Sequence, residues 1–310
     1  MTVRTDSIAD HPDAASDGTG AAAARSGRSR RGRGGRRRIR GGLEIGLLAG
    51  FAVVFLFPVV WMLETSLKHQ RDVYAVPAKF AGFPITFEHY ADVFSSGSVL
   101  STGFLNSVIV AGASTALATL LGVPAAWAYS RFPLTGKKHQ LFFILSTRFM
   151  PPVVVVIPIF LLFRDFMLID TLLGLVLVYT AFNLPFTIWM LRGFVDEVSP
   201  EYEDAAMLDG YSRFEAFVRM TLPLLIPGIA ATAVFALIFS WNEFVFATFL
   251  TSSPETRTAP PAIAGLIGGT TIDWGLVSAS AMVFALPVLV FAFIVRKHLV
   301  AGVTLGAVRR

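Results

Sequence analysis

The chain has 310 residues, of which 54% are hydrophobic, and a formal net charge of +5. A single soluble domain cannot bury that much apolar surface, so the composition excludes one and predicts an all-α integral membrane protein. There is no cysteine, which excludes disulfides, thiolate nucleophiles and cysteine-ligated metal. The five histidines show no metal-binding spacing and no phosphate-binding loop of the ATPase type occurs, so we expect no catalytic or metal residues.

An Arg-rich tail precedes the first apolar stretch and covers residues 1–42. It has almost nothing to bury, so we expect it to be a disordered cytoplasmic tail. It would anchor the chain by its positive charge or bind anionic lipid, and nucleic-acid binding by the tail stays open. The remaining residues, 43–310, form the predicted membrane domain.

Six apolar stretches are long enough to cross a bilayer, which takes about 20 residues. They cover 43–63, 103–129, 141–163, 172–195, 227–250 and 274–295. Six crossings put both termini on one side. Lys and Arg number twenty in the two tails, the 130–140 loop and the 192–226 segment, against five in the opposite loops. This asymmetry predicts that both termini and the segment between the fourth and fifth spans are cytoplasmic.

Proline is frequent within these stretches. Each proline removes a backbone hydrogen bond that neighbours or cavity water must replace. A single proline is explained equally well by a kink that serves packing. Together they favour broken helices around a cavity, as transport folds use, and they are Pro124, Pro151, Pro152, Pro158, Pro185 and Pro287.

Polar residues inside the apolar stretches are candidates for a translocation path, because their burial in hydrocarbon is costly unless they face a partner or water. Trp241, Asn242 and Glu243 combine an aromatic face with hydrogen-bonding groups, which suits a sugar. Arg148 and Asn183 complete the predicted path. An Arg148–Glu243 ion pair that serves packing alone is an equally good interpretation.

The polar segment 199–223 interrupts the apolar runs and is called the elbow below. Ser199 is the expected N-cap and Pro200 the first residue of a short helix that Gly210 ends. Ser212 and Glu215 then have the spacing of a capping box, which starts a second helix. An ordinary amphipathic connector is the alternative. A DNA-binding helix-turn-helix is disfavoured because the first helix is acidic and both ends are tethered to spans.

The elbow resembles the EAA loop of binding-protein-dependent ABC transporter permeases. The matching pattern is Asp204-Ala205-Ala206, Gly210, Met220 and Leu222-Pro223, with Asp204 in place of Glu and Met220 in place of Ile. The resemblance implies a cytoplasmic coupling helix that docks on a separate ATPase. Leu222 and Pro223 would then attach it to the fifth span, and the docking residues would be Glu203, Asp204, Ala205, Ala206, Asp209 and Gly210.

Over residues 43–310 the chain is similar to the MalG-like sugar permeases, notably in SWNEFVFATFLT and the C-terminal RKHLVAGVTLGAVRR. The resemblance implies import of a sugar, oligosaccharide or sugar alcohol across the bacterial cytoplasmic membrane. It also implies a second permease subunit, two ATPases that carry ATP and Mg²⁺, and an extracytoplasmic solute-binding protein that meets loops 64–102 and 251–273. No cofactor or nucleic acid is expected on this chain, which membrane lipid would surround.

Three alternatives to this interpretation remain. A secondary transporter, or an ABC permease for a non-carbohydrate solute, would have the same apolar pattern. A membrane-embedded enzyme would need paired catalytic groups at membrane depth, and the spans contain no such constellation.

Overall fold

The computed structural model describes the backbone of residues 30–95, 97–269 and 271–306 and the side chains of residues 44–95, 97–269 and 271–293. Its regular structure in these ranges is helical, as predicted. The chain divides into two units, Met1–Val59 and Val60–Arg310. The helices are α1 (Arg30–Ser66), α2 (Gln70–Val73), α3 (Glu88–Val93), α4 (Val99–Arg131), α5 (Lys137–Thr147), α6 (Pro152–Asp165), α7 (Leu172–Glu197), α8 (Glu201–Leu208), α9 (Arg213–Ala216), the π-helix η1 (Phe217–Thr221), α10 (Leu222–Trp241), α11 (Val245–Leu250), α12 (Ala259–Gly265) and α13 (Trp274–Gly306).

The predicted spans are present as helices. In the described residues, 5 helical segments are long and apolar enough to cross a membrane, and the bent pair α5 and α6 makes up to 6. The single segments are Glu44–Ser66, Val99–Arg131, Leu172–Glu197, Arg213–Trp241 and Trp274–Phe293.

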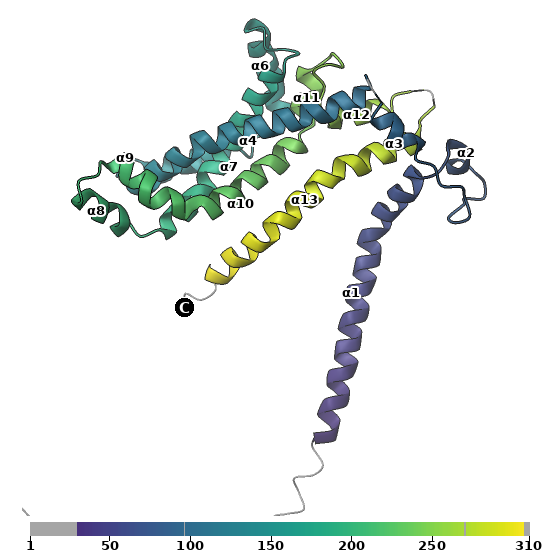
Figure 1. Ribbon diagram of the computed structural model, residues 1–310, viewed down its shortest axis with the longest axis horizontal. Coiled ribbons are helices and arrows are strands. Elements are labelled where there is room, and N and C mark those ends of the chain that lie inside the picture. The colour runs from purple at the N-terminus through teal and green to yellow at the C-terminus, as the bar shows by residue number, and fades with distance from the viewer. Residues whose placement is uncertain (1–29, 96, 270, 307–310) are drawn as a thin grey trace, which may run out of the picture. The chain divides into compact units, whose positions relative to one another are not determined.

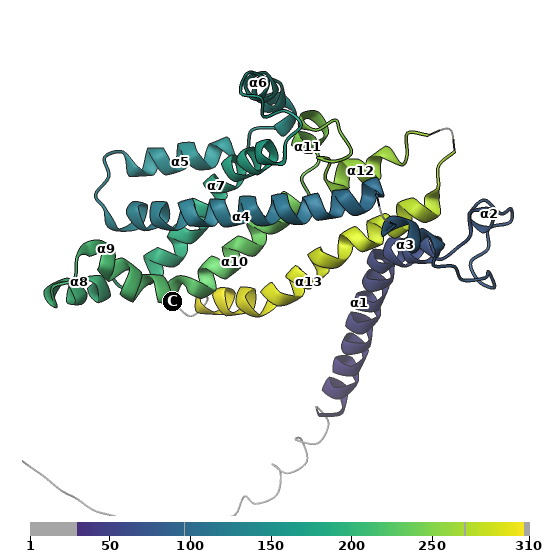
Figure 2. The same cartoon turned by 45° about the horizontal axis from the view of Figure 1, so that its top comes forward.

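The centre of the second unit is the packing of α4 against α7 and α10 (Figure 1). Small residues let these helices approach closely, which is how helices associate when lipid removes the hydrophobic drive between them. A Cβ added to Gly122 would lie 2.6 Å from Cγ2 of Thr187, and one added to Gly228 would lie 2.5 Å from Cγ of Phe194. Both ends of the bundle carry short helices, with α8 and α9 at one end and α11 and α12 at the other (Figure 2).

The third span is broken next to Pro151 and Pro152, as expected for prolines that interrupt a helix. Helices α5 and α6 meet at 89°, and Arg148 to Pro151 form the turn between them. Pro124, Pro158 and Pro185 instead lie inside continuous helices, as does Pro287, so these four prolines do not break their helices. Membrane helices tolerate such prolines because neighbouring helices, Ser or Thr hydroxyls and water can satisfy the freed backbone groups.

The fifth span lies closer to the N-terminus than the predicted 227–250. It begins at Arg213, because α9 continues through η1 into α10 without a break. It ends at Trp241, where Asn242 to Phe244 separate α10 from α11. An apolar run does not reveal this break, since both sides of it are hydrophobic.

The predicted disorder of the tail is outside the described residues for positions 1–29. From Arg30 the structure differs from the prediction, because α1 begins there and continues into the first span. Once a span has nucleated a helix, each added residue costs little, and arginine is a good helix former.

We predict that Gly122→Ala destabilises the protein while Gly112→Ala does not. The new methyl group at position 122 would collide with Thr187, which is 0% exposed and cannot move aside. Overpacking of this kind costs roughly 1–3 kcal/mol. Gly112 lies in the same helix with nothing within 4 Å of its added Cβ, so alanine there should be neutral or slightly stabilising. Thermal unfolding of the purified variants in detergent measures the difference, and equal midpoints would contradict the packing argument.

Candidate functional site

The elbow folds as a short helix, a turn and a second helix start. Helix α8 begins at Glu201 with Pro200 at the N-cap position, one residue later than predicted. Ser199 Oγ still accepts the backbone N–H of Glu201 at 3.4 Å. Gly210 ends α8 with φ +94°, a conformation that glycine tolerates best. Ser212 and Glu215 form the predicted capping box at the start of α9.

The outward side of α8 is acidic and contains a groove. Glu201, Asp204 and Asp209 are exposed, together with Tyr202 and Ala205. A groove of about 400 Å³ runs between α8 and Met220 of η1, and Ala205 and Ala206 lie along it. Ala205 is exposed, and its small side chain leaves the backbone of α8 accessible along the groove, whereas Ala206 is buried.

Glu203 was predicted to be one of the residues that dock on an ATPase, but its side chain points into the bundle. It is 4% exposed, and its carboxylate accepts hydrogen bonds from Trp127 Nε1 at 3.1 Å and Arg131 Nε at 3.1 Å. Thr221 Oγ1 donates to the same carboxylate at 2.5 Å. Glu203 and the buried Ala206 lie three residues apart on one face of α8, and this face is turned toward Trp127 and Arg131.

Leu222 and Pro223 begin α10, directly after the π-helix. Leu222 packs against the buried cluster that contains Trp127 and Phe217. The elbow therefore attaches to the bundle by a continuous helix as well as by the contacts of Glu203.

Three of the five predicted path residues lie together. Arg148, Asn183 and Glu243 line one cavity of about 50 Å³, at the break between α5 and α6 and close to the end of α10. This volume is on the scale of one or two water molecules, which occupy about 30 Å³ each in the liquid.

Side-chain hydrogen bonds hold two of these three residues. Asn183 Nδ2 donates to Ser240 Oγ at 2.7 Å, and Ser240 Oγ lies 2.9 Å from Ser114 Oγ, which links α7, α10 and α4. Glu243 caps α11 by accepting the backbone N–H groups of Phe246 at 3.0 Å and Ala247 at 3.1 Å. The amide of Asn183 and the carboxylate of Glu243 therefore both stabilise the fold around the cavity.

Arg148 forms no ion pair with Glu243 in the part of the chain that the structure describes, so the packing ion pair considered above is not formed. Its guanidinium lies over the ring of Phe239, 4.8 Å from the centroid. Such a cation–π contact partly replaces a counter-ion in an apolar setting.

Trp241 and Asn242 lie away from this cavity. Trp241 is buried against α13, where its Nε1 donates to Phe284 O at 3.1 Å and its ring stacks on Phe284. Asn242 is exposed, and its side chain donates to Ile238 O at 2.8 Å. The triplet was predicted to act together, but the end of α10 turns its three side chains in different directions.

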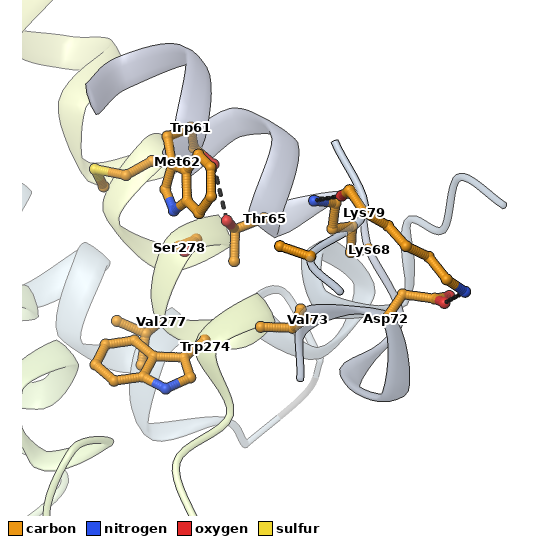
Figure 3. A pocket seen from close by; sticks show the side chains of 11 residues that line it. Trp61, Met62, Thr65, Lys68, Asp72, Val73, Lys79, Trp274, Val277 and Ser278 are labelled. Carbon is orange, nitrogen blue, oxygen red and sulfur yellow. Dashed lines mark hydrogen bonds and ion pairs between the residues drawn. The ribbon is translucent and has the colours of Figure 1, made fainter. Parts of the chain in front are cut away.

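A larger cavity lies at the end of the bundle opposite the elbow, within the second unit (Figure 3). It measures about 460 Å³, and Trp61 and Trp274 line it. Lys68 Nζ donates to Lys79 O at 2.5 Å, and Lys79 Nζ donates to Asp72 Oδ1 at 2.7 Å. These contacts fix residues 68–79 of loop 64–102 in one conformation.

Asp170 joins two loops at that same end, and the sequence analysis missed it. Its carboxylate accepts the backbone N–H groups of Ser252 at 2.9 Å and Ser253 at 3.1 Å, and also the hydroxyl of Thr256. Burial opposes ionisation, but these hydrogen bonds outweigh it and lower the pKa of Asp170 to about 2. The backbone at Asp170 has a positive φ of 59°, but the sequence does not reveal this conformation.

We predict that Asp170→Asn lowers the thermal unfolding midpoint near neutral pH. A depressed folded-state pKa stabilises the fold above the ordinary value of 3.8, and this stabilisation is lost as the pH falls toward 2. The difference between wild type and Asp170→Asn should therefore shrink over that interval. Asparagine tolerates the positive φ, so strain does not confound the comparison. Asp165→Asn, at an exposed carboxylate, is the control, and a difference independent of pH would refute the assignment.

Comparison with known proteins identifies the family. Residues 118–304, more than half of the chain, match the family model of the binding-protein-dependent transport system inner membrane component. A probable ABC transporter permease protein, y4oR of Sinorhizobium fredii, is 36% identical over 83% of this chain and 92% of its own length. The trehalose transport system permease protein SugB of Mycobacterium tuberculosis is 34% identical over 85% and 94%.

A solved structure supports the same fold. A chain of a bacterial ABC transporter involved in the import of the acidic polysaccharide alginate superposes with a TM-score of 0.70 over 84% of this chain and 96% of that chain, at 23% sequence identity. At this identity the likeness concerns the fold. The family model and the two relatives go further: the chain belongs to the inner membrane components, or permeases, of binding-protein-dependent ABC transport systems.

Proposed function

We propose that this chain is one permease subunit of an ATP-driven importer of a sugar, oligosaccharide or sugar alcohol in a bacterial cytoplasmic membrane. The observation that carries the proposal is the elbow, a short helix with an exposed acidic face between two apolar spans. Support for the solute class comes from relatives, among them SugB and the diacetylchitobiose uptake system permease protein DasC of Streptomyces coelicolor, which is 32% identical over 82% of this chain.

The elbow and both termini are placed in the cytoplasm by this proposal. The excess of Lys and Arg in the tails and in the segments on the elbow side supports that orientation. Loops 64–102 and 251–273 then lie outside the cell. The first loop contributes Lys68 and Asp72 to the lining of the larger cavity. Asp170 holds the start of the second loop. Both loops would thus offer ordered surfaces to a solute-binding protein.

The ATPase subunits would bind the outward side of α8. Asp204, Ala205, Asp209 and the groove beside them are accessible there, while Glu203 and Ala206 are buried. Two ATPases, carrying ATP and Mg²⁺, and a second permease subunit would complete the complex. This chain itself would hold no cofactor and would not hydrolyse ATP.

The solute would pass between this chain and the second permease. The cavity around Arg148, Asn183 and Glu243 measures about 50 Å³, whereas sites for small molecules usually measure roughly 300–1,000 Å³. The route would therefore open only when the helices rearrange, by rigid-body movement of the bundle that changes access from one side to the other.

Purification tests the assignment. A tagged chain extracted from its own membranes should carry along an ATP-hydrolysing subunit, and solute-binding protein should stimulate hydrolysis in proteoliposomes. Trehalose, maltose and a polyol serve as probes of the solute. Accumulation of solute in cells that lack the ATPase would instead establish a secondary transporter and defeat the proposal.

We predict that Gly210→Val abolishes both uptake and stimulated ATP hydrolysis, whereas Gly210→Asn retains much of each. The φ of +94° at this position is strongly unfavourable for a β-branched residue, while asparagine tolerates positive φ far better. Nothing lies within 4 Å of an added Cβ, so the effect is one of backbone conformation and not of collision. Uptake assays on reconstituted complexes measure the result. Normal coupling with valine would mean that the turn has no part in it.

A further inference from the structure

A carboxylate buried beneath the elbow is held by donors from separate helices. Glu203 lies on α8, Trp127 and Arg131 lie near the end of α4, and Thr221 ends the π-helix. Arg131 also extends to α7, because its Nη2 donates to Val198 O at 2.7 Å. This carboxylate thus connects the elbow to α4, which is distant in sequence. Through Arg131 it is also linked to the end of α7, which the elbow follows directly.

The surroundings of this carboxylate make the connection stiff. The Trp127 ring stacks on Phe217 with centroids 4.5 Å apart and meets Phe132 edge-on at 5.2 Å. Ala126, Val195 and Leu225 are part of the same buried cluster. Hydrogen bonds to a charged group are stronger where water is excluded, and breaking one leaves an uncompensated buried charge.

The covalent connection from the elbow to α10 passes through η1. A π turn of this kind is rare and occurs frequently at functional sites. A force applied to α8 would reach α4 through Glu203 and its donors, in addition to reaching α7 and α10 along the chain.

We propose that Glu203 is a positioning residue for energy coupling. Its buried carboxylate makes the elbow and the adjoining ends of α4 and α7 move as one body. The inference rests on the proposed function, because it concerns how movement of an ATPase bound to α8 reaches the membrane. Glu203 itself touches neither the ATPase nor the solute.

Glu203→Gln tests the role, because glutamine keeps the shape and loses the charge that Arg131 and Trp127 bind. In proteoliposomes with ATPase and binding protein, the complex should still assemble and hydrolyse ATP. Solute imported per ATP hydrolysed should fall by roughly tenfold, within the usual range of coupling between sites. Glu197→Gln is the matched control, since this carboxylate lies exposed at the end of α7. An unchanged ratio of import to hydrolysis in Glu203→Gln would overturn the proposal.

A distance measurement separates positioning from mere stability. Because the chain has no cysteine, spin labels can be placed at Leu208→Cys on α8, where the side chain is 91% exposed, and at Thr135→Cys just beyond α4, with cysteine-free partner subunits. The wild-type distance should be the same without nucleotide and with ATP trapped, and in Glu203→Gln it should shift or broaden with ATP. A wild-type distance that changes with ATP would refute movement as one body. If wild type imports solute without any ATPase, the proposed function fails as well.

Discussion

Close approach of α4 to α7 and α10 is the constraint on which the second unit depends. In a membrane, helices gain little by hiding apolar side chains from one another, so contact depends on van der Waals fit and on satisfied polar groups. Gly122 and Gly228 provide the fit by leaving no space for a side chain. Asn183 and Ser240 provide the polar link where α7 meets α10, and Ser114 extends it to α4. The positions of the elbow, the small cavity and the outer loops all follow from this three-helix contact.

Polar groups near the ends of the spans are bound chiefly within the chain. Glu203 binds three donors, Glu243 caps α11, and Asp170 holds the loop at 252–256. Each carboxylate joins segments that are separated in sequence or by a break in a helix. Such groups are costly to bury and are retained where they fix one arrangement among several. In this protein they fix how the short helices at both ends attach to the bundle.

The sequence alone predicted the helical class, the approximate spans and the two-part elbow, because apolar run length, Gly210 and the Ser212–Glu215 pair are local signals. It could not show which way a residue faces where the structure depends on distant partners. Glu203 belongs to the same acidic helix as Asp204, and only the approach of Trp127 and Arg131 turns it inward. Likewise the break after Trp241 lies within a hydrophobic run, and the role of Asp170 depends on a loop more than eighty residues away.

The division of α8 into two faces has an evolutionary consequence. Residues that point outward, such as Tyr202 and Asp204, have no part in the bonding beneath the helix, whereas Glu203 is committed to it. Substitutions on the outer face can therefore change what α8 binds without disturbing the interior of the subunit. Recognition of a partner and attachment to the bundle thus belong to different faces of one short helix, so each can vary independently of the other.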